Sequence, residues 1–445
     1  MNSQLTMLAA ATAFAVGCQA PVTSNEASPS QLACSSMLGY VDMRAAHVWC
    51  QFSEVDAPSQ WHVYTEGKDS LVTSADVLPG DFKTATTELS LLEPGTKYEA
   101  ILVSGGVSLD TLVFTTQPLW DFRTDPPAFK VLAGSCAYIN EPEYDRPGKG
   151  YGGEYEIFET MSEANGDLMV WLGDNIYLRE VDFGSYAGFG HRYTHMRSTP
   201  ELQELLGAMP HVAIWDDHDF GPNDCDGYFV RKEWSQQAFE SFWANPSYGL
   251  PGSQGGGITT QFRFMDVDFF LLDNRYHRVN HHNATQKPQI LGKEQLDWLM
   301  GALSASRAPF KIVAVGGQVL SDAAIYENHA QFPEERDELL RRIDEEGIRG
   351  VIFLSGDRHN GELTRLQLPG GNWVYDLTSS PLTSGSYDHS DEPNSLRVPG
   401  TMIGVRHFAE LNFSGPRKDR SLEILMRGVH GDTLWTQVLR AKELH

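Results

Sequence analysis

Hydrophobic positions divide the chain into two regions with different periodicities. From about residue 33 to residue 120, short runs rich in β-branched and aromatic residues are separated by Gly, Pro, Asp and Ser, without a helical period. The runs are HVWCQF, QWHVYT, TELSLL, KYEAILVSG and DTLVFTT. Short strands at close spacing with turn residues between them are typical of all-β folds. We therefore expect a small β-sandwich domain over residues 33–120, without a cluster of titratable groups.

The pattern changes after a Pro-rich hinge at residues 125–127. Nearly continuous apolar runs follow, as expected for strands buried on both faces: FKVLAG, DLMVWLG, HVAIW, DFFLLD, FKIVAVG and VIFLSG. Between these runs lie segments with apolar residues at helical spacing: YEIFETMSEA, PELQELLGAM, KEWSQQAFESFW, LGKEQLDWLMGAL and PEERDELLRRIDEEG. Alternating strands and helices predict a layered α/β domain over residues 128–440.

The N-terminus has the pattern of an export signal. Residues 1–18 contain a short Ala-rich apolar stretch, MLAAATAFAVG, which ends in small residues before Cys18. The tetrapeptide AVGC is similar to a bacterial lipobox, with Ala15 where Leu is usual, so a lipid anchor at Cys18 is an alternative to simple cleavage. Residues 19–32 are polar and predict a tether. We expect an extracytoplasmic protein that is periplasmic, secreted or lipid-anchored.

Charge narrows the range of partners. The chain has 34 Lys and Arg against 59 Asp and Glu, a formal net charge of −25 over 445 residues. Duplex nucleic acid is therefore not an expected partner, because binding it requires a basic surface. No apolar run reaches the length of about 18 residues that a membrane-spanning helix needs, so we expect no transmembrane segment.

Two of the five cysteines form a candidate pair. In an exported protein, Cys34 and Cys50 are close enough in sequence to close a small loop within the sandwich, and we predict a structural disulfide there. Cys225 has no evident partner, and a structural role is expected for it.

The ends of four apolar runs carry the candidate chemistry. GSCAY follows the first run, GDNIY the second, DDHDFGPND the third and SGDRH the sixth. Because ligands bind outside the carboxyl ends of strands in α/β sheets, we expect these ends to meet in one crevice. The groups delivered are Cys136, Asp174, Tyr177, Asp216, Asp217, His218, Asn223, Asp357 and His359. So many buried carboxylates require cations for compensation, which predicts a multinuclear metal site.

The motifs also resemble a known family. GSCAY, WLGDNIY, WDDHDFGPND, LLDNRYHR, LGKEQLDWL, LSGDRHNGEL and DLTSSPL occur in this order between about residues 128 and 385, and the chain resembles the PhoD-like alkaline phosphatases of the calcineurin-like metallophosphoesterase superfamily. The resemblance implies a ferric iron at Cys136, Asp174 and Tyr177, with Asp174 as a candidate bridging ligand, and calcium held nearby by acidic residues. It is also consistent with an N-terminal sandwich, here similar to fibronectin III or immunoglobulin-like domains.

The same resemblance assigns the remaining site residues. Asp217 takes the place of a metal ligand and His218 that of a catalytic histidine outside the coordination sphere. Asp216 is a candidate for either role. Asp357 and His359 match the last ligand pair of the superfamily, and Asn223 resembles a calcium ligand of the family.

These assignments predict hydrolysis of a phosphoric ester. Closely spaced cations neutralise phosphoryl oxygens and lower the pKa of a bound water, so a metal-bound hydroxide is the expected nucleophile. His218 would donate a proton to the leaving alkoxide or stabilise its charge. Arg275 is a candidate clamp for a non-bridging oxygen, with an ion pair to Asp273 as the alternative. The sequence does not distinguish monoesters, diesters and phospholipids as substrates.

Two other functions are compatible with parts of the pattern. Cys136 and His359 would form a thiol nucleophile and base for acyl transfer, but that chemistry leaves Tyr177 and the acidic groups without a role. Alternatively, the protein is a non-catalytic calcium-binding or adhesion module in which the sandwich makes the contacts.

Overall fold

The computed structural model describes residues 34–55, 57–252 and 255–444. The predicted signal peptide (1–18), the polar tether (19–32) and lipidation at Cys18 lie outside the described residues. Within those ranges no helix has both the length and the apolar character that crossing a membrane requires.

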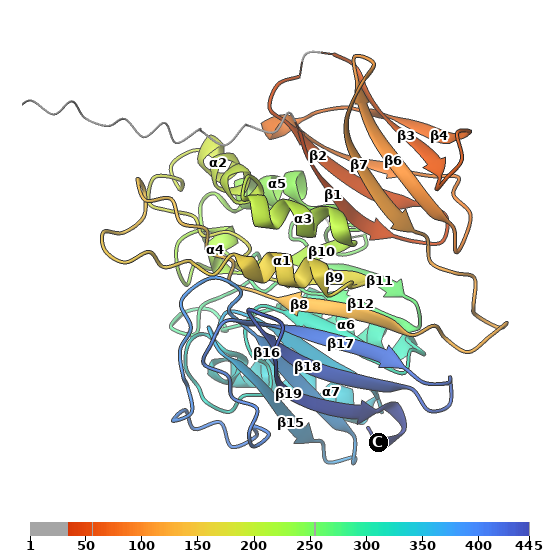
Figure 1. Ribbon diagram of the computed structural model, residues 1–445. Helices are drawn as coiled ribbons and strands as arrows, with labels where there is room; N and C mark the ends of the chain where they lie inside the picture. The colour runs from red at the N-terminus through yellow and green to blue at the C-terminus, as the bar shows by residue number, and fades with distance from the viewer. Residues whose placement is uncertain (1–33, 56, 253–254, 445) are drawn as a thin grey trace, which may run out of the picture. The chain divides into compact units, whose positions relative to one another are not determined.

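Two antiparallel sheets form the predicted N-terminal sandwich (Figure 1). One sheet contains, in spatial order, β1 (Cys34–Val41), β2 (Ala46–Phe52) and β5 (Thr84–Leu89). The other contains β4 (Leu71–Val77), β3 (Ser59–Thr65), β6 (Lys97–Ser104) and β7 (Val107–Thr115). A 3-10 turn, η1 (Asp81–Lys83), precedes β5. Trp61 and Val63 are buried two residues apart on one face of β3, as strand periodicity requires, and the all-β prediction is confirmed.

The predicted bridge between Cys34 and Cys50 is not formed, since both thiols are free and buried. In the pairing of β1 with β2, Cys50 lies opposite Ser36, and Cys34 lies opposite Phe52. A hydrogen bond with Cys34, together with burial, raises the pKa of the Cys50 thiol, so the two thiols are in contact but are not bonded. Sequence spacing therefore identified two cysteines that are neighbours on paired strands, and both are present as free thiols.

Two six-stranded mixed sheets form the predicted α/β region. The first contains, in order, β10 (His211–Ile214), β9 (Leu168–Leu172), β8 (Phe129–Gly134), β17 (His407–Ser414), β18 (Ser421–Gly428) and β19 (Thr433–Arg440). The second contains β11 (Thr260–Phe264), β12 (Val267–Leu271), β13 (Lys311–Val315), β14 (Val351–Ser355), β16 (Trp373–Ser379) and β15 (Gly361–Gln367). The sheets share one hydrophobic core, so the layered α/β prediction is confirmed.

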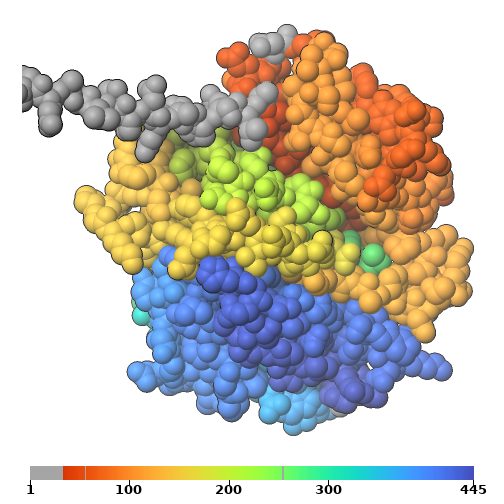
Figure 2. Space-filling view, in the orientation of Figure 1, coloured from red at the N-terminus to blue at the C-terminus, as the bar shows by residue number. Residues whose placement is uncertain are grey.

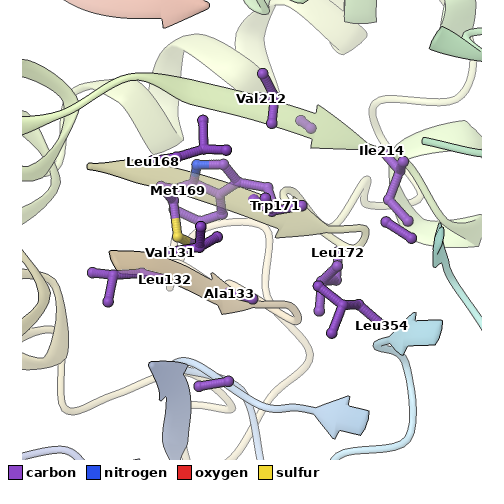
Figure 3. Close-up of a cluster of buried hydrophobic side chains, with 14 of the residues drawn as sticks. Val131, Leu132, Ala133, Leu168, Met169, Trp171, Leu172, Val212, Ile214 and Leu354 are labelled. Carbon is purple, nitrogen blue, oxygen red and sulfur yellow. The ribbon is translucent and has the colours of Figure 1, made fainter. Parts of the chain in front are cut away.

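The six strands that the apolar runs predicted (β8, β9, β10, β12, β13 and β14) are buried on both faces. Figure 3 shows this core around β8, β9 and β10, where Leu132, Trp171 and Val212 are all fully buried. In the second sheet, Phe269 and Ile312 belong to the core shared with the first sheet, while their neighbours Phe270 and Val313 pack with the helices on the opposite face. This arrangement gives four layers, with helices outside two stacked sheets.

Helices cover both outer faces. The first sheet packs with α1 (Glu156–Glu163), α2 (Tyr186–Arg197), α3 (Pro200–Ala208) and α5 (Lys232–Phe242), and the second with α6 (Lys293–Ala305) and α7 (Pro333–Glu345). All five helices that the spacing predicted are present. Two short helices, α4 (Asp217–Phe220) and η2 (His329–Gln331), and the terminal η3 (Ala441–Glu443) complete the fold. In the space-filling view, the light-green residues of α3 lie directly against the sandwich (Figure 2).

One helix, α2, lies outside the five segments that helical spacing predicted. The segment REVDFGSYAGFGHRYTH lacks an amphipathic period and contains several glycines, yet its second half forms α2. Gly190 is needed there for close packing, because a β-carbon at this position would lie 2.0 Å from the Phe82 ring. The sandwich therefore packs closely on this glycine of α2, and sequence periodicity did not reveal the contact.

Candidate metal centre

Four strand ends deliver the candidate ligands to one place. β8 ends just before Cys136, β9 before Asp174, β10 before Asp216 and β14 before Asp357. β8, β9 and β10 are parallel neighbours, so their carboxyl ends share one edge of the first sheet. β14 brings Asp357 to them from the second sheet.

The backbone at these strand ends adopts an uncommon conformation. Cys136, Asp174, Asp357 and His359 have φ angles of 59°, 49°, 64° and 55°, in the left-handed region that favours glycine. Non-glycine residues persist in this region only where the surrounding structure holds them, and such positions cluster at functional sites. The residues with this strained backbone are therefore the same ones that were identified as candidate metal ligands from their side chains.

The first donor group combines sulfur, oxygen and nitrogen atoms. One ligand atom each from Cys136, Asp174 and His359 lies within 4.8 Å of the others. The Cys136 Sγ is 3.5 Å from Asp174 Oδ2, and it accepts a hydrogen bond from Ser380 at 3.1 Å. Tyr177 Oη lies 3.3 Å from His359 Nε2, which adds a phenol to the group. These are the donors that a transition metal such as iron accepts.

Two further groups share residues with the first. Asp174, Asp217 and His218 form one, and Asp216, Asp217 and Asp357 form the other, each within the same 4.8 Å limit. Asp174 and Asp217 each belong to more than one group, so the donors form a continuous cluster. This overlap is the geometry that bridging carboxylates require in a multinuclear site.

Burial and mutual repulsion raise the pKa of Asp174 and Asp357 in the cluster, whereas His218 and Arg275 lower the pKa of Asp217. Asp216 Oδ2 and Asp217 Oδ1 are buried and have no hydrogen-bond partner in the described ranges. Burial, together with the charges of Asp216 and Asp217, raises the pKa of Asp357 to about 8. Burial also raises the pKa of the Cys136 thiol to about 12, and the charge of Asp357 adds to the effect. A cation in contact with these groups would reverse the shifts by favouring the ionised forms, so the donor set fits metal binding.

Arg275 is buried and bonded to carboxylates of the chain itself. Its Nε lies 2.5 Å from Asp216 Oδ1, and its Nη1 lies 2.8 Å from Glu327 Oε2. Asp273 accepts a hydrogen bond from the Arg275 backbone N–H at 2.9 Å rather than from the guanidinium. The predicted ion pair of Arg275 with Asp273 is therefore wrong, since the guanidinium pairs with Asp216 and Glu327 instead.

Asn223 and Cys225 lie next to the cluster. Asn223 is exposed and lines a cavity beside His218. The Cys225 thiol points to the Asp217 carbonyl oxygen at 3.8 Å.

Sequence reasoning missed two acidic neighbours of the cluster, Asp224 and Glu327, which form a fourth group with Asp217. Asp224 stands in the DDHDFGPND motif and could have been found there. Glu327 is distant in sequence, and no motif marked it. Glu327 also pairs with Arg278 at 2.7 Å, in addition to Arg275, so its charge is already compensated by the protein.

Comparisons with known proteins agree with this geometry. Residues 132–417 match the model of the family described as PhoD-like phosphatase. Alkaline phosphatase D of Bacillus subtilis is 22% identical over 317 residues, which cover 61% of this chain and 52% of that protein. The match thus spans about half the length of this curated relative.

Two solved structures share the fold. A structure of PhoD superimposes with a TM-score of 0.74 at 17% identity and covers 92% of this chain and 90% of its own. Purple acid phosphatase from yellow lupin seeds gives a TM-score of 0.67 at 11% identity and covers 92% of this chain and 74% of its own. At these identities the likeness concerns the fold alone.

Proposed function

Because the chain belongs to the PhoD-like phosphatase family, we propose that it hydrolyses phosphoric esters at a multinuclear metal centre. The observation that carries this proposal is the overlap of the donor groups, in which Asp174 and Asp217 are each shared. Cations in such a cluster would neutralise phosphoryl oxygens and lower the pKa of a bound water.

The donor types support an assignment of metals. Cys136, Asp174 and Tyr177 would hold a ferric iron, with His359 beside them, because thiolate, phenolate and imidazole suit a transition metal. Calcium prefers oxygen ligands, and Asp217, Asp357 and Asn223 would supply them. Asp174 would be shared between neighbouring cations.

Three residues act without being primary ligands in this proposal. The His218 imidazole packs against the Tyr177 ring at a tilt of 34°, with ring centroids 4.2 Å apart, which restrains the imidazole beside the cluster. From this position His218 would donate a proton to the leaving oxygen. Arg275 holds Asp216, and Asp216 in turn caps the short helix α4 that carries Asp217 and His218.

The acyl-transfer alternative has no support in the geometry. The Cys136 thiol lies against Asp174 and Ser380, and within the described ranges no imidazole hydrogen bonds to it. A thiol nucleophile would need a base in contact with it.

The proposal is tested by metal analysis of the purified protein together with turnover of phenyl phosphate and diphenyl phosphate. We expect iron and calcium in the protein and hydrolysis of at least one of the esters. A protein that binds neither metal, and hydrolyses neither ester when both metals are supplied, would contradict the proposal and favour the binding-module alternative.

We also propose export through residues 1–18, with Cys18 as the lipidated residue or the cleavage boundary, and separate domains over 33–120 and 128–440. The Ala-rich stretch and the change in hydrophobic pattern support these assignments. Mass spectrometry of the mature N-terminus from membrane and soluble fractions distinguishes the two outcomes at Cys18.

A further inference from the structure

A cavity of about 780 Å³ opens beside the candidate metal centre. Its lining includes Tyr138, Tyr144, Tyr151, Tyr177, Phe183 and His218. Tyr177 and His218 also contact the donor cluster, through His359 and Asp174 respectively. These two residues therefore form the boundary between the metal centre and the cavity.

The polar atoms of Tyr138 and Arg179, which both line the cavity, are already bonded within the protein. Tyr138 Oη donates to Asp145 at 2.9 Å, and Arg179 pairs with the same carboxylate at 2.7 Å. The Arg179 guanidinium lies over the Tyr138 ring, 4.0 Å from its centroid. Because the polar ends are satisfied, Tyr138 offers the cavity its ring rather than a free hydroxyl.

Three of the aromatic side chains, Tyr138, Tyr151 and Tyr177, form a continuous wall. Ring centroids are 4.9 Å apart between Tyr138 and Tyr177, and 5.1 Å apart between Tyr138 and Tyr151. Tyr144 is 37% exposed and Phe183 is half-buried, so both retain ring surface that a ligand can cover. Aromatic walls of this kind bind flat rings by burial and by stacking.

We propose that this cavity is a binding subsite for a ring-bearing alcohol group, aryl or nucleoside in type, of the phosphoric ester. The proposal rests on the proposed function, because it places the ester at the adjacent metal centre. His218 lies at the boundary, so the group in the cavity is the one whose oxygen His218 would protonate on leaving. The subsite thus selects the leaving alcohol, and Tyr144 and Phe183 are specificity-determining residues.

The test compares two phosphonates that differ only in the ring. Benzylphosphonate and ethylphosphonate carry the same anionic group, and neither is hydrolysed. Inhibition constants are measured on the metal-loaded enzyme with glycerol phosphate and diphenyl phosphate as substrates. We expect benzylphosphonate to bind at least about tenfold more tightly than ethylphosphonate, because only it buries a ring.

Variants assign this preference to the cavity. Tyr144→Ala and Phe183→Ala should each reduce the ratio of the two constants by about threefold or more, whereas Tyr144→Phe retains the ring and should retain the ratio. Phe122→Ala is the matched control, since Phe122 is 90% exposed and is not part of the cavity lining. Metal content of each variant is measured alongside, and it should not change.

Failure of the subsite is distinguishable from failure of the proposed function. Equal affinities for the two phosphonates in an active enzyme would overturn the subsite and leave the phosphatase proposal intact. The same conclusion holds if Phe122→Ala lowers the ratio as much as Tyr144→Ala does. An enzyme that hydrolyses neither ester and binds neither phosphonate would contradict both proposals.

Discussion

The Cys136 thiol is fully buried, with Asp174 and Ser380 against its sulfur. Burial and the nearby charge of Asp357 oppose its ionisation, so a thiolate at this position requires a cation. A small apolar side chain would fill the space but would supply no ligand. Replacing Cys136 by a small apolar residue therefore tests whether the thiol binds metal or only fills space.

We predict that Cys136→Ala removes iron from the protein and lowers turnover by more than about 100-fold, because loss even of a residue that orients a ligand typically costs about 10–100-fold. Metal analysis and phosphoester turnover check this. Cys225→Ala serves as a control, since its thiol lies outside the donor groups. Unchanged iron and activity in Cys136→Ala would show that sulfur is not a ligand.

His218 provides the complementary test. We predict that His218→Ala lowers turnover by about 10²–10⁴-fold while the metals remain bound, because its proposed role is proton donation rather than coordination. Turnover and metal content are measured on the same preparation. Loss of metal in this variant would instead make His218 a ligand, which its proximity to Asp174 and Asp217 permits geometrically.

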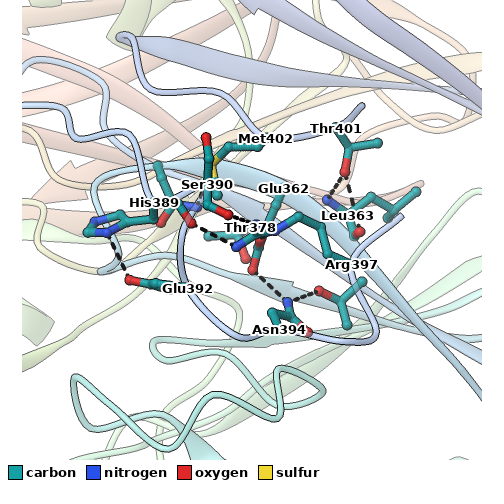
Figure 4. Close-up of polar contacts among 12 residues, drawn as sticks. Glu362, Leu363, Thr378, His389, Ser390, Glu392, Asn394, Arg397, Thr401 and Met402 are labelled. Carbon is teal, nitrogen blue, oxygen red and sulfur yellow. Dashed lines mark hydrogen bonds and ion pairs between the residues drawn. The ribbon is translucent and has the colours of Figure 1, made fainter. Parts of the chain in front are cut away.

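At the level of elements, the loop after β16 controls the position of His359. The Gly385 carbonyl oxygen lies 2.5 Å from His359 Nδ1, so the backbone of this loop orients the imidazole. The loop is anchored to the second sheet through Glu362, which contacts Arg397 and accepts from Asn394 at 3.0 Å (Figure 4). Glu362 is 1% exposed, so this anchor is shielded from water.

We predict that Arg397→Ala lowers the free energy of unfolding by about 3–5 kcal/mol, because it leaves the buried Glu362 charge without its partner. Urea denaturation measures the change. Arg341→Ala is the control on α7, where Arg341 pairs with Glu338 and Glu345 at the exposed surface and its loss should leave the free energy of unfolding nearly unchanged. Equal effects of the two substitutions would contradict the anchoring role.

His211, at the start of β10, makes stability depend on pH. It accepts a hydrogen bond from the Trp171 indole at 3.0 Å, and its other ring nitrogen lies 2.9 Å from the Leu205 carbonyl oxygen. Burial lowers the pKa of His211 from 6.5 to about 3. Below pH 6.5 the unfolded chain therefore binds a proton that the folded protein does not. The free energy of unfolding consequently decreases as the pH is lowered from 6.5 to 3.

We predict that His211 lowers the free energy of unfolding by about 1.4 kcal/mol for each unit by which the pH falls between pH 6 and 4. His211→Gln has no titrating ring and should flatten this part of the profile by that amount. Denaturation of both proteins at several pH values checks the difference, and any release of metal in acid affects both equally. Parallel profiles would show that His211 does not titrate on unfolding.

At the scale of the molecule, the donor cluster concentrates negative charge in a protein whose net charge is already −25. Bound cations would relieve this repulsion in the folded state only, so they would stabilise it by mass action. Two cations at about 1,000 times their dissociation constants add about 8 kcal/mol.

We predict that chelation abolishes turnover and lowers the melting temperature by about 5–10 °C, since a chain of this length loses about 0.9 kcal/mol per degree. Thermal denaturation with and without chelator measures the shift, and readdition of iron and calcium should reverse it. A melting temperature insensitive to chelator would contradict metal binding within the folded core.

The sequence by itself determined the strands with unbroken apolar runs, five strands of the sandwich, most helices and the residues at the strand ends, but it did not predict β1, β4, β11 or β15–β19. Burial on both faces produces unbroken apolar runs, and the candidate ligands follow these runs within a few residues. Local sequence patterns therefore located both the strands and the candidate ligands. Cys136, Asp174 and Asp357 were identified in this way, and the rule that parallel strands share an edge placed them together.

Only the tertiary structure decided features that depend on segments far apart in sequence. Arg275 pairs with Asp216 across 59 residues, and Glu327 joins them from a loop without a motif. Phe82 of the sandwich packs closely on Gly190 of α2, and the pairing of β1 with β2 makes Cys34 and Cys50 diagonal neighbours. The aromatic cavity likewise combines side chains from separate segments. Such contacts arise from packing between elements, which local periodicity does not encode.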